Sequence, residues 1–190
     1  MKLLGRHLGL GISIFFFFGV LSTTNAQAGS DSNSRYFDYP IPSIEHMLFY
    51  IQKSTNTNTV VYQLNLLDNE ELNLSEPIKV FWLRYQEEGQ RKNLSFIEQK
   101  FAYGVISKQI KNETNVFDVK LVALKSREFK LERNEDGQSK VVTIIDGKRA
   151  SLSKIFLEIE GNSFWPKITY IDIYGLDLNT GKEIHERLFV

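Results

Sequence analysis

The residues best suited to chemistry are an aspartate and an arginine, each placed in an otherwise apolar strand pattern. Alternation puts Asp172 between Tyr170 and Tyr174 on one strand face, and Arg84 closes a row that contains Trp82. Either face of the Asp172 strand could be the inner one. A buried carboxylate costs several kcal/mol unless a cation or hydroxyl compensates it, so we expect Arg84 to be its partner. The alternative is that both charges face solvent or form a structural pair.

An Arg–Asp pair among aromatic rings would be a polar spot in an apolar ligand pocket. Without the four phenylalanines at 15–18, the chain has 14 − 4 = 10 Phe, together with 8 Tyr and 2 Trp. These rings could line a cavity or simply fill the core of a β-domain. The candidate ligand-binding residues are Tyr62, Trp82, Arg84, Tyr103, Tyr170, Asp172 and Tyr174.

Paired carboxylates offer a second reading, a hydrolase that acts on an envelope carbohydrate or lipid. Asp172 would share acid–base work with Glu158 or Glu186, which requires the two carboxylates to lie about 5–10 Å apart in a concave site. No nucleophile elbow, phosphate loop, dinucleotide fingerprint or zinc-protease motif occurs, so no catalytic residue is assigned. A third reading needs no pocket, because an exposed edge strand could recruit another chain.

Histidine and cysteine give little support to a metal, a cofactor or a thiol chemistry. Beyond His7 the chain has only His46 and His185, which are far apart in sequence, and it has no cysteine. We expect both histidines to be ordinary surface or boundary residues. The polar loop 53–59 is dense in hydroxyls and amides, and capping of its own backbone is the expected use. No metal site and no cofactor is predicted.

The charge balance excludes a class of partners. The sequence has 23 basic and 23 acidic residues, and without Lys2 and Arg6 the count becomes 23 − 2 = 21 basic against 23 acidic, about −2. Sequence-independent attachment to nucleic acid or to an anionic membrane surface requires a concentrated basic face, and no such face is visible in the sequence. We therefore expect no nucleic-acid partner.

Hydrophobic periodicity predicts a mainly β domain. Apolar and polar residues alternate most clearly over 116–124, and Gly137, Gly147 and Gly181 follow polar residues where hairpin turns need positive φ. We expect an antiparallel β-sandwich or partly closed β-barrel with about nine strands and one short helix. The nine expected strands are 47–53, 59–66, 78–85, 116–124, 128–133, 140–145, 152–160, 168–178 and 183–190.

The short helix is predicted from a capping box. In Ser95-Phe96-Ile97-Glu98 the hydroxyl can accept from the Glu98 amide while the carboxylate reaches back to the Ser95 amide. Gly104 is a plausible stop. A helix of two to three turns is too short to be stable alone, so Phe96, Ile97 and Phe101 are expected to be buried against the sheet or in a barrel end.

The N-terminus predicts export. Residues 1–28 combine a basic start, an apolar stretch around 15–18 and a small-residue cleavage site, and the apolar stretch is too short to be a membrane anchor. Residues 29–39 are expected to be a flexible tether and 40–190 a single β-rich domain, with an extended Tyr39–Pro42 entry. We expect a monomer without an integral membrane segment after cleavage, in the periplasm or cell envelope of a bacterium or secreted.

Several motifs resemble an uncharacterised family of exported bacterial proteins, the domain of unknown function 4833. The motifs extend over nearly all of the chain after the leader: Leu48–Ser54, Asn56, Asn58–Tyr62, Val80–Tyr85, Phe101–Gly104, Tyr170–Gly175, Thr180–Lys182 and Glu186. The resemblance implies a bacterial envelope setting and one compact domain, and it assigns no catalytic residue. From the residues themselves, the leading hypothesis is a non-enzymatic domain that binds a small apolar or amphipathic ligand or an envelope partner.

Overall fold

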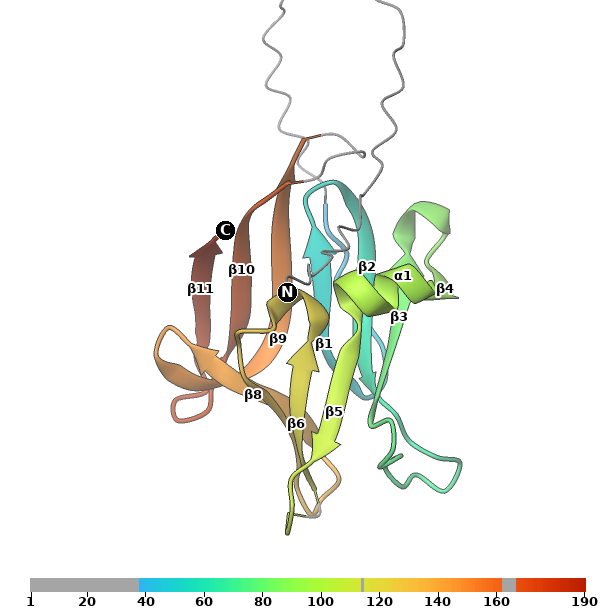
Figure 1. Cartoon of the computed structure of the whole chain (residues 1–190), viewed down its shortest axis with the longest axis vertical. Helices are drawn as coiled ribbons and strands as arrows, with labels where there is room; N and C mark the ends of the chain where they lie inside the picture. The colour runs from blue at the N-terminus through green and yellow to red at the C-terminus, as the bar shows by residue number, and fades with distance from the viewer. Residues whose placement is uncertain (1–37, 114, 162–166) are drawn as a thin grey trace, which may run out of the picture. The chain divides into compact units, whose positions relative to one another are not determined.

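The computed structural model describes residues 38–113, 115–161 and 167–190. The predicted leader at 1–28 and most of the tether lie outside this part of the chain. The described residues form a mainly β domain in which one short α-helix interrupts the strands (Figure 1). The eleven strands are β1 (Met47–Lys53), β2 (Asn56–Leu64), β3 (Ile78–Arg84), β4 (Gln90–Asn93), β5 (Val105–Gln109), β6 (Val116–Leu121), β7 (Phe129–Arg133), β8 (Ser139–Ile145), β9 (Lys148–Glu160), β10 (Lys167–Asp177) and β11 (Glu183–Phe189).

The strands form one strongly curled sheet, a half-barrel in which the long strand β9 is the branch point. The path runs β4-β3-β2-β1-β9-β8-β7-β6-β5, and β10 and β11 continue from the other edge of β9. Residues 148–151 of β9 pair with β8, residues 154–157 pair with β1, and β10 pairs along most of its length. Two branches therefore diverge from β9 and curl toward each other, which brings β3 near β5 (Figure 1).

All nine predicted strands are present, and the predicted partly closed barrel is confirmed as a half-barrel. Sequential strands pair antiparallel as predicted, whereas β1 and β9 pair in parallel. Two short strands were not predicted. β4 consists of four exposed polar residues, and β5 has two adjacent apolar residues followed by three polar ones, so neither shows the alternation by which strands are recognised.

The hairpin turns follow the predicted chemistry. Gly137, Gly147 and Gly181 have φ of 80°, 71° and 68°, a region that L-residues rarely adopt. The last of these turns joins β10 to β11, where Asp177 accepts hydrogen bonds from the amides of Asn179 and Thr180. That turn sets the register that places the polar residues of β10 opposite those of β11.

The main core lies on the concave face of the sheet. Phe49, Tyr62, Phe117 and Ile173 are among its fully buried members. On β10, Ile171 and Ile173 face this core, so the face that carries Tyr170, Asp172 and Tyr174 is the outer one. This settles the choice that the sequence left open.

The helical segment begins as predicted but packs differently. Ser95 and Glu98 form the expected capping box before α1 (Phe96–Glu98), and a π-helical turn, η2 (Gln99–Tyr103), follows up to Gly104. The prediction that its apolar side chains are buried is wrong, because Phe96, Ile97 and Phe101 are 73%, 68% and 66% exposed. Trp82 and Tyr62 of the inner sheet face bond to the two ends of the segment, and Figure 1 shows α1 in front of β2 and β3. Within the described ranges, no helix has the length and hydropathy needed to span a bilayer.

Candidate functional site

The seven predicted site residues divide into two groups on opposite faces of the sheet. Tyr170, Asp172 and Tyr174 lie on the outer face of β10, whereas Tyr62, Trp82, Arg84 and Tyr103 belong to the inner face or to the helical segment beside it. The expected pairing of Arg84 with Asp172 is wrong. β2, β1 and β9 separate β3 from β10 in the sheet, and alternation turns the two side chains to opposite faces.

Asp172 instead pairs with its cross-strand neighbour Arg187 on β11. Its carboxylate accepts two hydrogen bonds of 2.7 Å, from Nε and from Nη2 of Arg187. His185 Nε2 lies 2.9 Å from Oδ1, and the Tyr174 hydroxyl donates to Oδ2 at 3.4 Å. The side chain of Asp172 is 4% exposed although it lies on the outer face, because these neighbours cover it. Both carboxylate oxygens are thus engaged.

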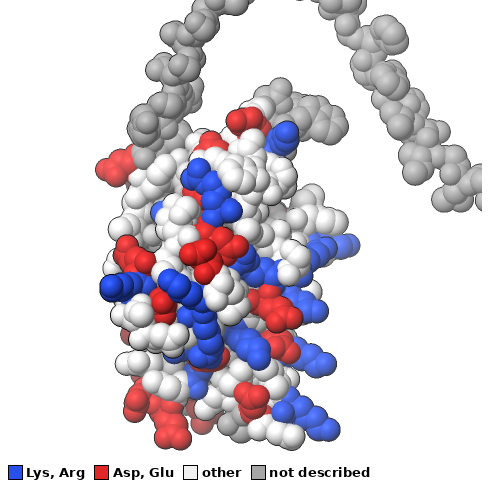
Figure 2. Space-filling view, turned by 90° about the vertical axis from the view of Figure 1, so that its left-hand side faces the viewer, with Lys and Arg blue, Asp and Glu red and all other residues white. Residues whose placement is uncertain are grey.

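Aromatic rings and cations alternate around this pair. The guanidinium carbon of Arg187 lies 3.9 Å from the centroid of the Tyr170 ring, and Lys154 Nζ lies 4.4 Å from that of Tyr174. Tyr174 stacks on His185 with centroids 4.6 Å apart. The contacts favour a self-contained surface network, because each cation already has an aromatic or anionic partner. The face seen in Figure 2 accordingly shows basic and acidic side chains interspersed.

The electrostatics of the network hold its aspartate in the charged form. Hydrogen bonding from Arg187 lowers the pKa of Asp172, and it outweighs the opposing effect of burial. Burial lowers the pKa of Lys154, an effect that the nearby Asp172 charge opposes. An ionised carboxylate with both oxygens occupied is poorly suited to serve as a general acid or base.

The carboxylates considered for hydrolysis are arranged unfavourably. Glu186 pairs in register with Ile173, so it lies on the opposite face from Asp172, and it forms two hydrogen bonds with Arg127. Glu158 shares the outer face with Asp172 and accepts from the Tyr170 hydroxyl at 3.2 Å. Glu186 lines a pocket with Arg127 and Thr143 that does not include Asp172.

The inner group forms the anchor of the helical segment. Trp82 on β3 donates from its indole nitrogen to Glu98 Oε1 at 3.2 Å, while Glu98 Oε2 accepts from the Ser95 amide at 2.7 Å. At the other end, the hydroxyl of the buried Tyr62 donates to the carbonyl oxygen of Tyr103 at 2.7 Å. Burial raises the pKa of Tyr103 to about 12, so its ring stays neutral. Two side chains of the sheet thereby hold both ends of the segment.

Two cations flank the indole of Trp82. Lys53 Nζ and the Arg84 guanidinium carbon lie 5.3 Å and 5.9 Å from its ring. Burial lowers the pKa of Lys53, partly offset by the charge of Glu98. Arg84 donates to Glu87 at 2.8 Å, while its Nε is the one buried side-chain polar atom of the described residues without a hydrogen-bond partner. Trp82 and Arg84 are thus neighbours, as predicted, although Asp172 is not with them.

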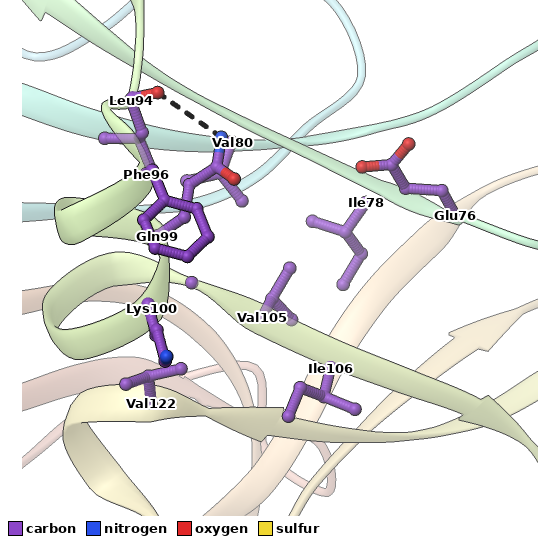
Figure 3. Close-up of a pocket in the computed structure, with 11 residues that line it drawn as sticks. Glu76, Ile78, Val80, Leu94, Phe96, Gln99, Lys100, Val105, Ile106 and Val122 are labelled. Carbon is purple, nitrogen blue, oxygen red and sulfur yellow. Dashed lines mark hydrogen bonds between the residues drawn. The ribbon is translucent and has the colours of Figure 1, made fainter.

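An apolar groove opens beside this anchor, where the two branches of the sheet approach each other. It has a volume of about 380 Å³ between β3, β5 and the helical segment. Ile78 and Val80 line one wall, Val105 and Ile106 the other, and Phe96 and Lys100 lie at its helical end (Figure 3). Glu76 lies at a different end from Lys100 (Figure 3). None of the seven predicted residues lines the groove, although Tyr103 directly precedes its Gly104.

Sequence reasoning missed the partner of Asp172 and the groove for different reasons. The turn at 178–181 aligns residues symmetrically about it, so a correct register for that hairpin would have placed Arg187 opposite Asp172. The groove has no local signal, because residues from β3, β5 and η3 (Val122–Leu124) meet there only through the curl of the sheet.

The remaining polar candidates have structural roles. The predicted polar loop 53–59 is mostly strand, because β1 ends at Lys53 and β2 begins at Asn56; within it Asn56 accepts from the Asn58 amide at 3.0 Å, as the predicted capping requires, and Asn58 accepts from the amide of the distant Gln86. His46 lies at a turn before β1, 3.4 Å from the exposed Glu45. No three His, Asp or Glu side chains of the described residues come together in a way that could hold a metal ion.

Comparison with known proteins gives one match. A family model described as "Domain of unknown function (DUF4833)" matches residues 49–187, which include nine of the eleven strands in full and most of β1 and β11. No curated protein and no solved structure matches the chain. The matched region contains both the outer network and the groove.

Proposed function

We propose that this chain, which belongs to the DUF4833 family of domains of unknown function, is a non-enzymatic binding domain for a small amphipathic ligand. The groove between β3, β5 and the helical segment supports this proposal most directly. A ligand with an apolar tail and an anionic head would match the apolar walls of the groove and the charge of Lys100. The proposal retains the amphipathic ligand expected from the sequence and moves its site from the Arg84–Asp172 region to the groove.

The size and lining of the groove favour such a ligand. Its volume of about 380 Å³ is within the range of small-molecule sites, roughly 300–1,000 Å³, which are mostly apolar with a few polar groups. Val80 and Val105 are half-buried and Ile106 is 62% exposed, so apolar surface is available on both walls. Covering this surface with a ligand tail would contribute roughly 25 cal/mol per Å² buried.

The polar groups of the groove favour one orientation of the ligand. Lys100 is exposed at the helical end, while Glu76 lies at another end (Figure 3). An anionic head near Lys100 would gain charge attraction and avoid Glu76. The tail would then extend along Val105 and Ile106.

The predicted leader leads us to propose export to the bacterial envelope, with the mature domain a monomer that binds no nucleic acid. The hydrolase alternative receives no support from a specific contact, because Asp172 is engaged by Arg187 and Glu186 by Arg127. The Arg187–Asp172 network is better explained as a stabilising element of the outer face.

Titration with 11-(dansylamino)undecanoic acid, an anionic fatty-acid probe that fluoresces in apolar surroundings, tests the proposal. Ile106→Glu introduces a charge into one wall of the groove at an exposed position, so the variant should fold normally. It should weaken probe binding by about tenfold or more, because a carboxylate would oppose both the tail and the anionic head.

Ile41→Glu is the matched control, since Ile41 is 78% exposed and does not line the groove. Both variants should have the thermal unfolding midpoint of the parent. Absence of saturable probe binding to the parent protein, or equal loss in the two variants, would refute the groove as the ligand site.

A further inference from the structure

We propose that the exposed apolar side chains beside the groove form a docking surface for an anionic lipid bilayer. These residues are called the apolar rim and are Phe96, Ile97, Lys100, Phe101 and Ile106. The inference deepens the proposed function, because it rests on an amphipathic ligand that enters the groove and names the surface from which that ligand comes. The partner that we propose for the apolar rim is the lipid bilayer itself.

The apolar rim is exposed to an unusual degree for its composition. Phe96, Ile97, Phe101 and Ile106 are between 62% and 73% exposed, and they fall within eleven consecutive positions of the chain. Single exposed apolar residues are ordinary on protein surfaces, whereas a cluster of large ones marks an interaction site. Phe96, Lys100 and Ile106 of the apolar rim also line the groove (Figure 3), and Ile97 and Phe101 neighbour Phe96 and Lys100 in the chain.

This exposure follows from how the segment is held. Trp82 anchors its first turn through Glu98, and Tyr62 anchors its last residue through the Tyr103 carbonyl. Gly104 follows at a point where backbone approaches closely: an added Cβ would lie 1.8 Å from the Gln99 carbonyl oxygen. The segment is therefore fixed in an orientation that presents its phenylalanines outward.

The charge of the region complements an anionic bilayer. Lys100 belongs to the apolar rim, and Lys92 lies opposite Trp82 in the β3–β4 pair, so folding gathers basic side chains that no run in the sequence shows; Arg91 stacks on Phe81 of the other face, and Lys108 lies opposite Asp118. The ammonium group of Lys100 lies 5.5 Å and 5.3 Å from the rings of Phe96 and Phe101. Lys120 lies directly opposite Ile106 in the β5–β6 pair.

Phenylalanines that enter the headgroup region, with lysines that reach toward lipid phosphates, are the arrangement by which peripheral proteins bind membranes. Of the two acids beside the apolar rim and the groove, Glu98 accepts from Trp82 and Ser95, and Glu76 lies at a different end of the groove from Lys100 (Figure 3). Contact of the apolar rim with a bilayer would bring the open groove to the lipid surface, so an amphipathic molecule could pass between them without crossing water.

A single-cysteine label can test this surface in the full chain, because the sequence contains no cysteine. We would introduce Ile97→Cys, attach the environment-sensitive dye NBD, and add vesicles of phosphatidylcholine with 30% phosphatidylglycerol, a proportion chosen to be roughly that of a strongly anionic surface. The dye should shift its emission to the blue and be quenched by lipids that carry a nitroxide on the acyl chain. Ile144→Cys, whose parent residue is 54% exposed on β8, is the matched control and should not respond.

Two variants in the labelled chain assign the effect to the apolar rim. Lys100→Glu should weaken vesicle association about fivefold or more, since each basic residue near an anionic surface contributes about a fivefold factor. Phe96→Ser with Phe101→Ser should weaken it by about tenfold or more. All of these side chains are exposed, so unchanged unfolding midpoints are expected and would show that the fold is intact.

A response at Ile144→Cys equal to that at Ile97→Cys would overturn the proposal, as would no response at either position. A blue shift that grows with protein concentration in the absence of vesicles would also overturn it, because a second copy of the chain would then occupy the apolar rim. The dansyl-undecanoate titration without vesicles is independent of this assay. If the labelled rim enters vesicles but the protein does not bind the dansyl probe, the proposed ligand is refuted. If the protein binds the probe but the labelled rim does not enter vesicles, only the docking surface is refuted.

Discussion

Arg187 on β11 and Asp172 on β10 face each other across the last hairpin and share two hydrogen bonds of 2.7 Å. The side chain of Asp172 is 4% exposed and that of Arg187 is 42% exposed. A buried carboxylate is thus compensated by a cation that remains partly hydrated, on the outer face of a sheet. This is the arrangement of a structural pair, and it has consequences for stability that differ from those of a binding site.

Asp172→Asn should destabilise the protein without reducing probe binding in the groove. The amide preserves the shape of the side chain but loses charge-assisted hydrogen bonds, which would cost about 2 kcal/mol of the free energy of unfolding. Urea unfolding followed by circular dichroism measures this cost. Glu158→Gln is the control on the same face, because Glu158 has one hydrogen bond of 3.2 Å from Tyr170 and should cost much less. An Asp172→Asn variant of full stability with weakened probe binding would argue for a ligand site here.

Stability should fall on acidification below about pH 4. Hydrogen bonding from Arg187 lowers the pKa of Asp172, and backbone amides and Arg127 act similarly on the pKa values of Asp177 and Glu186. Because these carboxyl groups bind protons more weakly when folded, their contribution is complete above the unfolded pKa, near 4, and disappears as the pH falls through the lower folded pKa. Urea unfolding from pH 6 to pH 2 should show this decline.

The Asp172→Asn variant should lose less stability than the parent over the same acid range, because one of the responsible carboxyl groups is gone. Parallel pH profiles for the two proteins would contradict the assignment of a lowered pKa to Asp172.

Gly104→Ala should be among the most destabilising single-methyl changes in the chain. The added Cβ would meet the Gln99 carbonyl oxygen at 1.8 Å and its carbon at 2.8 Å, so the end of η2 would have to move. We expect a loss of more than about 2 kcal/mol in the free energy of unfolding. Gly147→Ala is the control, since no heavy atom lies within 4 Å and only the positive φ opposes it, at about 1 kcal/mol. Equal costs would show that η2 can shift freely.

Glu98→Ala should loosen the helical segment while leaving the sheet intact. The change removes the Glu98 carboxylate, which accepts from the Ser95 amide and from Trp82, and should cost about 1–2 kcal/mol, while the amide of residue 98 can still donate to the Ser95 hydroxyl. Hydrogen exchange should accelerate over 96–103 and stay unchanged in β6 and β9. Glu87→Ala, which removes the exposed partner of Arg84, is a matched control and should not affect that segment. Uniform acceleration throughout the sheet would contradict a local role.

Most of the secondary structure could be predicted from the sequence because its signals are local. Alternation identified the nine longer strands, the capping box of Ser95 and Glu98 identified the start of α1, and three glycines marked hairpin turns. Each of these depends on residues a few positions apart, whose side-chain period or backbone preference acts before any long-range packing. The short strands β4 and β5 lack such a pattern, and they form by backbone pairing with the edge strands β3 and β6.

Only the tertiary structure decided which of these residues meet. Arg84 and Asp172 both close or interrupt apolar rows, yet the order of the strands places them on opposite faces, and the register of the last hairpin supplies Arg187 to Asp172. Likewise, the helical pattern predicted that the apolar side chains of the segment are covered, whereas Trp82 and Tyr62 hold the segment against the inner face so that Phe96 and Phe101 remain exposed. Strand order, register and the curl of the sheet depend on contacts between distant parts of the chain, so local sequence determines the elements and long-range packing determines their neighbours.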